Sequence, residues 1–153
     1  MITEHDYRVK VTSTGAKTGD LSAPEDGLPD LGVASPPEFG GPAGVWSPEH
    51  LFVASVASCL MTTFRAIADA SGLEILSYTD ASSGRMILDD DHLYRIESVT
   101  LRPRVVIADE NKVDKARRIL DKAERACLIT RSVNAQIEME GSIELRGEHQ
   151  VSS

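Results

Sequence analysis

The sequence predicts an α+β protein in which an antiparallel sheet packs against helices on one face. Three observations lead to this fold class. The chain has 153 residues, of which 41% are hydrophobic, and this suits a single domain with one ordinary core over residues 1–153. Segments in which apolar and polar residues alternate lie at both ends and in the middle of the chain, and two helical segments separate them. The order of these segments lacks the regular strand-helix-strand repeat of a parallel sheet.

The N-terminal part is expected to begin with a strand, because Tyr7, Val9 and Val11 alternate with polar residues. One face of this strand should be buried. Residues 15–46 follow, and they hold seven of the eleven glycines and five of the seven prolines. This composition predicts a long loop with only short turns and edge strands. Such a loop is either a binding segment or lid, or a plain surface loop, and the composition fits both.

A long helix is predicted from Ser47 to Ala70. Ser47 is a favourable N-cap, Pro48 suits the first helical position, and Glu49 places a negative charge in the first turn. Apolar side chains cover nearly the whole circumference, and Arg65 is the one charged residue in its middle. We therefore expect a helix that is buried on most sides, with a partner subunit covering one of them.

Four further elements are expected after this helix. The first two are a strand over residues 75–88, irregular at 81–84, and a long strand over 93–107 in which Pro103 marks an edge or a bulge. A second helix follows over residues 111–126, with an apolar seam that leads to Cys127. The last strand covers residues 137–145, and residues 147–153 should form a frayed tail.

Charge and composition exclude several classes of function. Sixteen basic and twenty-four acidic residues give a net charge of −8, and without a visible basic patch the chain should repel nucleic acid and anionic lipid. The N-terminus lacks the features of a signal peptide, and no segment approaches the ~20 apolar residues of a membrane span. We expect a cytoplasmic protein. The four histidines have no ligand spacing and no Gly-rich phosphate loop is present, so neither a metal nor a cofactor is expected.

The two cysteines are the best candidates for chemistry. In a reducing compartment Cys59 and Cys127 are either inert buried thiols or partners in a transient catalytic disulfide. Cys59 lies in the middle of the apolar helix, which disfavours its thiolate unless a cation or a hydrogen-bond donor is supplied from elsewhere. Glu49 lies ten residues earlier, about 15 Å along a straight helix. It could act on Cys59 only through a break in the helix or, as we expect, across a dimer interface, where it would position a cationic group.

Two segments carry a resemblance to a known family. Ser47-Pro48-Glu49-His50-Leu51-Phe52-Val53-Ala54-Ser55-Val56-Ala57-Ser58-Cys59 resembles the signature of the OsmC/Ohr family, the osmotically inducible and organic hydroperoxide resistance thiol peroxidases. That signature is a Pro-Glu pair, a leucine, small residues and then the first cysteine about ten positions on. Ala123 to Ile129 resembles the second-cysteine segment of the family. The order of elements also matches from about Tyr7 to Leu145.

The resemblance implies an intertwined homodimer, in which central helices pack beneath sheets built from both chains. It implies that Cys59 is the peroxidatic thiolate, that Cys127 is the resolving thiol and that Glu49 holds a catalytic arginine. The implied substrate is an organic hydroperoxide. Cys59 would become a sulfenic acid and condense with Cys127 to a disulfide, which a dithiol reductant, lipoyl-type or other, reopens.

The chain departs from the family pattern at one point. Family peroxidases carry an arginine in the N-terminal hairpin or in the loop before the Pro-Glu pair, yet between Arg8 and Arg65 this chain has none. Arg8, Lys17 or a cation from another segment would have to substitute, and lysine lacks the bidentate fork of arginine. The alternative is a non-enzymatic dimer of the same fold that binds a small apolar molecule or senses thiol oxidation. The missing arginine and the unusual Pro36 to Pro42 segment favour this alternative.

Overall fold

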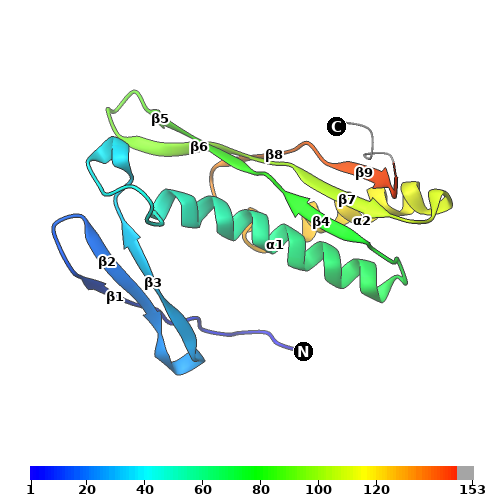
Figure 1. Ribbon diagram of the computed structural model, residues 1–153, viewed down its shortest axis with the longest axis horizontal. Coiled ribbons are helices and arrows are strands. Elements are labelled where there is room, and N and C mark those ends of the chain that lie inside the picture. The colour runs from blue at the N-terminus through cyan, green and yellow to red at the C-terminus, as the bar shows by residue number, and fades with distance from the viewer. Residues whose placement is uncertain (148–153) are drawn as a thin grey trace. The chain divides into compact units, whose positions relative to one another are not determined.

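The computed structural model describes residues 1–147, which form two compact units, one over residues 1–51 and one from Phe52 onward (Figure 1). The fold class is α+β, as the sequence predicts, with two α-helices and three small sheets. The single domain expected over residues 1–153 remains a prediction. The frayed tail expected over residues 147–153 lies, apart from Gly147, outside the described residues.

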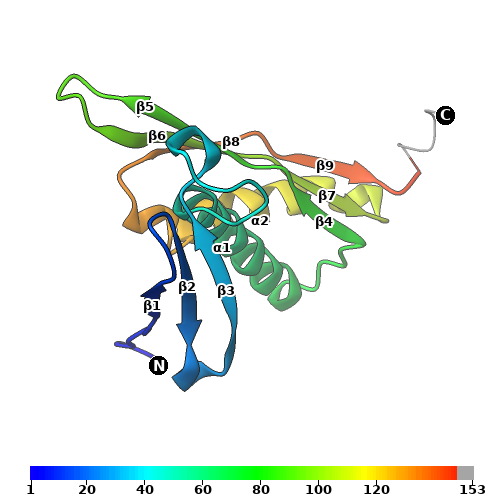
Figure 2. The same ribbon diagram turned by 60° about the vertical axis from the view of Figure 1, so that its left-hand side comes forward.

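The first unit contains a three-stranded antiparallel sheet, whose strands lie side by side in Figure 2. Its strands, in spatial order, are β1 (Lys10–Ser13), β2 (Thr18–Ala23) and β3 (Leu28–Ala34). Gly27 closes the turn between β2 and β3 with a φ of 65°, a left-handed conformation that favours glycine. Short 3₁₀ turns follow β2 at Pro24–Asp26 and β3 at Pro37–Phe39.

Two predictions for this unit were wrong. Residues 15–46 are not a loop with only turns and edge strands, because they contain β2, the central strand of the sheet, paired with the edge strand β3. Composition misled here because most of these prolines and glycines occupy turns or the edge strand β3, where both are tolerated, and Pro29 lies within that strand. The first strand begins at Lys10 instead of Tyr7, and all of its residues are exposed, so it has no buried face.

Helix α1 (Pro48–Ala70) has the ends that the sequence predicts. Ser47 is fully buried, and its Oγ accepts a hydrogen bond from the backbone N–H of His50 at 3.2 Å, which satisfies an otherwise unpaired helical donor. The helix ends before Gly72, whose φ is 66°. There the N–H of Leu73 donates to the carbonyl oxygen of Ala68 at 2.9 Å, as in a Schellman motif.

The predicted burial of α1 on most sides includes a partner subunit, and that part remains a prediction. In the single chain one stripe of the helix is fully buried, formed by residues four apart: Val56, Leu60, Phe64 and Ala68. Other apolar side chains are only partly covered, and Met61 is 38% exposed.

By length and composition this helix could also cross a membrane, so the expectation that no segment approaches a span was wrong on that measure. A core helix of a soluble protein passes the same test.

In the second unit three rows of strands lie side by side, and each row is interrupted once (Figure 1). One sheet has the order β4-β7-β9 and the other the order β5-β6-β8. The bounds are β4 (Ser77–Asp80), β5 (Ser83–Leu88), β6 (Tyr94–Leu101), β7 (Pro103–Ile107), β8 (Gln136–Met139) and β9 (Ser142–Leu145). The pairs β4/β7 and β5/β6 are antiparallel, whereas β6/β8 and β7/β9 are parallel. The sheets are therefore mixed and not purely antiparallel.

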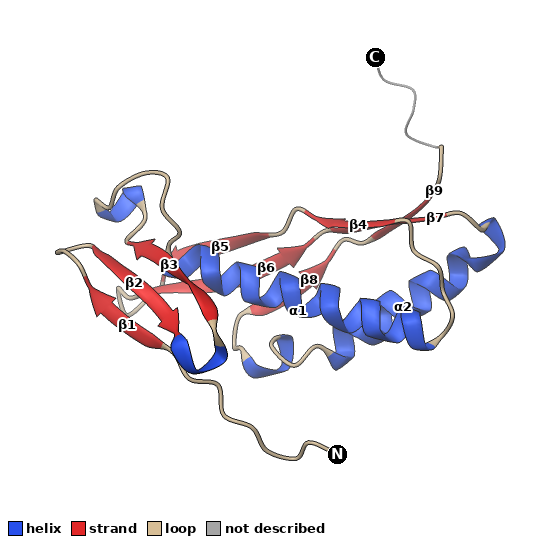
Figure 3. Ribbon diagram, turned by 60° about the horizontal axis from the view of Figure 1, so that its bottom comes forward, coloured by secondary structure: helices blue, strands red, loops and turns tan. Residues whose placement is uncertain are grey.

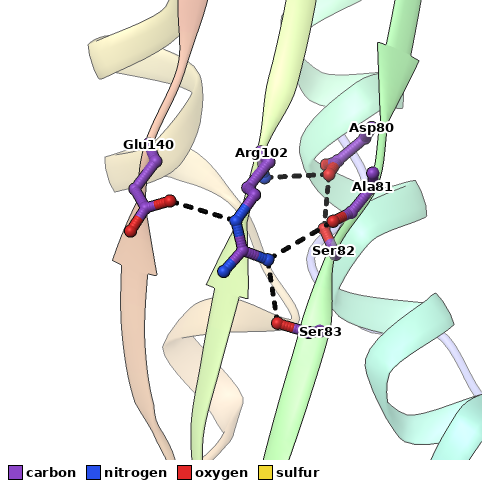
Figure 4. A network of polar contacts seen from close by, with 6 residues as sticks. All are labelled: Asp80, Ala81, Ser82, Ser83, Arg102 and Glu140. Atoms are coloured by element: carbon purple, nitrogen blue, oxygen red, sulfur yellow. Dashed lines mark hydrogen bonds and ion pairs between the residues drawn. The ribbon is translucent and has the colours of Figure 1, made fainter.

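A polar network spans the interruptions (Figure 4). The backbone N–H of Arg102 donates to Asp80 Oδ1 at 2.9 Å, which replaces a bond between strands. The Arg102 side chain donates through Nε to Glu140 Oε2 at 3.0 Å and through Nη1 to Ser83 Oγ at 2.8 Å. Of the edge or bulge expected at Pro103, the edge is wrong, because Pro103 begins β7 in the central row, directly after the interruption at Arg102. Proline is tolerated there, since the first residue of a strand needs no N–H for the ladder.

Helix α2 (Val113–Ala126) lies with α1 on one side of these strands (Figure 3). Its predicted seam is confirmed, since Ala116, Leu120 and Ala123 are buried together with Ile119. Two glycines let the helices approach the strands. A Cβ on Gly84 would lie 2.5 Å from Val53 Cγ2 of α1, and one on Gly141 would lie 2.7 Å from a methyl carbon of Leu120 in α2.

We predict that Leu60→Ala or Phe64→Ala lowers the free energy of unfolding by ~2–5 kcal/mol, because each leaves a cavity in the core. Both side chains are fully buried, at 0% exposure. Arg65→Ala is the control on the same helix, and it should cost far less because Arg65 is exposed. Urea denaturation followed by circular dichroism measures the difference. A loss below about 0.5 kcal/mol for Leu60→Ala, as at a surface position, would contradict the core assignment.

Candidate active site

The structure brings the two predicted cysteines together. Cys59 lies in the middle of α1 and is partly exposed, whereas Cys127 follows the last residue of α2 and is fully buried. Both are free thiols, and they lie close enough for each to shift the pKa of the other. A thiol that solvent can reach therefore lies beside one that it cannot.

Hydrogen-bond donors converge on the Cys59 sulfur. Burial raises the pKa of Cys59, but hydrogen bonds from the Ile129 backbone, the Cys127 thiol, the Thr63 side chain and the Leu128 backbone outweigh that effect. The pKa of Cys59 is therefore lower than that of an ordinary thiol. The Thr63 hydroxyl oxygen lies 4.0 Å from the sulfur, one helical turn along α1.

Cys127 is affected in the opposite direction. Burial raises its pKa, and two features of Cys59, the hydrogen bond between the thiols and the negative charge on the neighbouring sulfur, raise it further. The side chain and backbone of Thr130 lower the pKa of Cys127 but do not reverse the shift. Cys59 is thus the thiol that ionises first, and Cys127 is the one that keeps its proton.

The turn after α2 fixes these donors. Cys127 leaves the helical conformation with a ψ of 116°, so the chain changes direction immediately after it. The carbonyl oxygen of Cys127 accepts a hydrogen bond from the N–H of Arg131 at 3.1 Å, and the Leu128 carbonyl oxygen accepts one from Ser132 Oγ at 2.8 Å. These bonds stabilise the turn whose Leu128 and Ile129 backbone lowers the pKa of Cys59.

Tyr78 of β4 lies in the same buried region. Its ring is 5.5 Å from that of Phe64, and its hydroxyl is buried without a hydrogen-bond partner among residues 1–147. Burial raises the pKa of Tyr78, and the negative charge of Asp80, with that of Cys127 once this thiol ionises, raises it further. The phenol therefore stays protonated and is a potential donor beside the dithiol.

Glu49 is in the first turn of α1, as expected, but its predicted cation is missing. Its Oε2 atom is buried and has no hydrogen-bond partner in the described part of the chain. Arg8 pairs instead with Glu25 at 3.3 Å, and the Lys17 ammonium group donates to the carbonyl oxygen of Phe39. Helix α1 is continuous from Pro48 to Ala70, so the break that could bring Glu49 to Cys59 is absent.

Sequence reasoning missed most groups that act on the two sulfurs. Backbone amides cannot be found in this way, because every residue other than proline has one. The position of Thr63, four residues after Cys59, was an available signal. Tyr78 and Thr130 gave no signal, since long-range packing brings them to the cysteines. Among residues 1–147, no group of three or more histidine, cysteine or acidic side chains could hold a metal ion.

The fold and the paired thiols define a class: a dithiol protein of OsmC-like architecture. Residues 41–141 match the sequence model of the family described as OsmC-like protein. The chain belongs to this family, and the predicted resemblance is confirmed. Some proteins of the same fold are named as organic hydroperoxide resistance proteins.

Three relatives illustrate the similarity. The chain is 27% identical to the uncharacterized protein YmaD of Bacillus subtilis (strain 168) over 95% of this chain and 99% of that protein. It resembles the structure of an OsmC-like protein of unknown function from Vibrio cholerae, with a TM-score of 0.82, 22% identity, and coverage of 91% of this chain and 100% of that one. An organic hydroperoxide resistance protein OsmC from Legionella pneumophila gives a TM-score of 0.71, 22% identity, and coverage of 92% and 99%.

We predict that the alkylation of Cys59 in a Cys127→Ser protein has a pH midpoint below the ~8.5 of a free thiol. Hydrogen-bond donors stabilise the thiolate, so Thr63→Val should move this midpoint upward. Thr62→Val is the matched control, because the Thr62 hydroxyl donates to the Cys59 carbonyl oxygen, at 3.1 Å, and not to the sulfur. The rate of iodoacetamide modification, followed by mass spectrometry across pH, gives the midpoint. A value well above that of a free thiol would show that burial dominates.

Proposed function

We propose that this protein is a cysteine-based peroxidase that reduces organic hydroperoxides. One observation carries the proposal: Cys59 and Cys127 are neighbours whose pKa values shift in opposite directions, downward for Cys59 and upward for Cys127. A peroxidatic cysteine must be a thiolate that peroxide can reach, and a resolving cysteine must be close to it. The partial exposure of Cys59 and the full burial of Cys127 agree with these two roles.

The reaction runs in two steps. The Cys59 thiolate attacks the terminal oxygen of R–O–O–H, the O–O bond breaks, and the alkoxide leaves as the alcohol after taking a proton. Cys59 is then a sulfenic acid. The Cys127 sulfur attacks it, and a Cys59–Cys127 disulfide and one water molecule form. A dithiol reductant supplies the two electrons that reopen the disulfide.

Backbone amides take over part of the role of the absent family arginine in this proposal. The amides of Leu128 and Ile129, with Thr63, stabilise negative charge on Cys59 without a charged side chain. Such fixed dipoles need no reorganisation during the reaction. They do not explain the carboxylate of Glu49, which has an unsatisfied buried oxygen in the single chain.

We propose further that the protein is a homodimer and that it works in the cytoplasm. The partly covered apolar side chains of α1, including Met61, support the dimer, because a second copy could bury them. A second copy could also supply a cation for Glu49 of each chain and complete the site around Cys59. Reducing cytoplasmic conditions suit a disulfide that opens in every catalytic cycle.

A second candidate function is supported by a separate observation. An open pocket of about 340 Å³ is lined by Gly44, Val45, Trp46 and His50, and the Trp46 side chain is 51% exposed there. An exposed indole beside a small pocket suits a small apolar ligand. Together with the unpaired Glu49, this pocket favours the non-enzymatic dimer that binds such a molecule or senses thiol oxidation.

We predict that a mild alkyl hydroperoxide converts the reduced protein into an intrachain Cys59–Cys127 disulfide. Cys127→Ser should stop at a sulfenic acid on Cys59, because the resolving thiol is missing. Intact mass and peptide mapping follow both products, and Cys59→Ser is the control that should not react. Sulfenic acid that accumulates first on Cys127, or a wild-type protein that forms no disulfide, would refute the assigned roles.

We predict that Glu49→Gln slows peroxide attack at least about tenfold, equivalent to ~1.4 kcal/mol in the barrier, while the fold is kept. A mixed dimer of Glu49→Gln and Cys59→Ser chains tests whether Glu49 acts across the interface. If it does, the Cys59 of one chain meets the Glu49 of the other, and one site regains its full rate. If the mixed dimer is as slow as Glu49→Gln alone, Glu49 acts within its own chain. A monomer in sedimentation analysis would reject both dimer proposals.

A further inference from the structure

The charge of the chain is unevenly distributed. Seven of the sixteen lysines and arginines lie between residues 112 and 131, together with only three of the twenty-four acidic residues. This segment therefore has a net charge of +4 within a chain of net charge −8. The segment comprises α2 and the turn that follows it. The expectation of a chain without a basic patch is therefore wrong for this segment, which contains Cys127.

Most of these cations lie on the outer side of α2, opposite the buried seam. Four basic side chains of the helix are exposed: Arg117, Arg118, Lys122 and Arg125. Arg131 is exposed in the turn. None of the five takes part in an ion pair or hydrogen bond from its side chain within residues 1–147. Asp114 and Asp121 are exposed on the same helix and offset only part of the positive charge.

An apolar side chain lies among these cations. Leu128 is 64% exposed although it directly follows the fully buried Cys127. It lies three residues after Arg125 and three before Arg131. Leu128 therefore adds one exposed apolar side chain to this positive surface. Arg118, Lys122, Arg125, Leu128 and Arg131 are called the α2 surface below.

We infer that the α2 surface docks an acidic protein that carries the dithiol which reopens the Cys59–Cys127 disulfide. This inference rests on the proposed peroxidase function. The positive segment complements an acidic protein, and Leu128 gives the contact an apolar centre. Nucleic acid and anionic membranes fit less well, because the rest of the chain is strongly acidic and would repel an extended polyanion.

The location of the surface suits the chemistry. A thiolate of the reductant attacks the sulfur of Cys59, because Cys127 is fully buried and Cys59 is partly exposed. The Cys59–Cys127 bond breaks, and the Cys127 sulfur leaves and takes a proton. The second thiol of the reductant then attacks the mixed disulfide and releases Cys59. The reductant becomes a disulfide, and two electrons and two protons have passed to the cysteine pair.

The test compares two reductants that have the same dithiol chemistry. One is free dihydrolipoamide, and the other is dihydrolipoamide attached to an acidic lipoyl domain, each with cumene hydroperoxide as the oxidant. The measured quantity is the ratio of kcat/KM for the attached dithiol to that for the free one. We expect this ratio to fall with added salt, because salt screens exposed charges. Arg118→Glu/Arg125→Glu should lower the ratio at least tenfold.

Lys10→Glu/Arg95→Glu is the matched control, since it changes the net charge equally at two exposed residues outside the α2 surface. It should leave the ratio within about twofold. Leu128→Ser should lower the ratio without altering its dependence on salt. Equal ratios in the two double variants, or a ratio that does not respond to salt, would overturn the docking surface.

A binding measurement keeps this inference distinct from the peroxidase proposal. Fluorescence anisotropy of a labelled oxidised lipoyl domain needs no peroxide and no turnover. Binding that weakens in Arg118→Glu/Arg125→Glu and not in the control would support the surface even if neither reductant sustains peroxide reduction, a result that would reject the peroxidase. Tighter binding to duplex DNA or to vesicles containing phosphatidylserine than to the acidic domain would overturn the inference.

Discussion

The candidate site depends on one interaction, the approach of the turn after α2 to the sulfur of Cys59. A thiolate in an apolar helix is unfavourable, because burial removes the water that would solvate its charge. The amides of Leu128 and Ile129 replace part of that solvation with dipoles that the turn holds in position. Without this turn the two cysteines would be ordinary packing residues. With it, the chain has a reactive thiol next to a protected one.

Packing of the two helices on the same face of the strands makes this approach possible. The buried stripe of α1 and the seam of α2 contribute to one core, so the middle of α1 lies opposite the end of α2. Gly84 and Gly141 set how closely the helices lie to the strands, since a side chain at either position would push a helix away. The chemistry at the sulfur is therefore sensitive to residues that never touch it.

Local signals in the sequence were sufficient for part of this structure. The ends of α1 follow from Ser47 and Gly72, and the seam of α2 follows from its apolar period, because neighbouring residues decide such features. The parallel pairing of β8 and β9 could not be predicted, since it depends on partners far away in the sequence. The sheet of the first unit was hidden because its turns and edge strand use glycine and proline. The cysteines were identified by the motifs around them, but the groups that tune them were not.

The interruptions in the three rows of strands have a consequence for mutational tolerance. Each row is divided at the same level, and the divided ends are connected by the Arg102 network and by the backbone bond from the Glu140 N–H to the Leu101 carbonyl oxygen, instead of a continuous ladder. A strand that slips by one residue turns every side chain to the opposite face, and an unbroken ladder passes that error along its whole length. Here a slip between β5 and β6 would end at the division and leave β4, β7 and β9 in their native alignment. An inserted or deleted residue in the hairpin between β5 and β6 would thus be confined to one half of the sheet, away from the half that contains Tyr78.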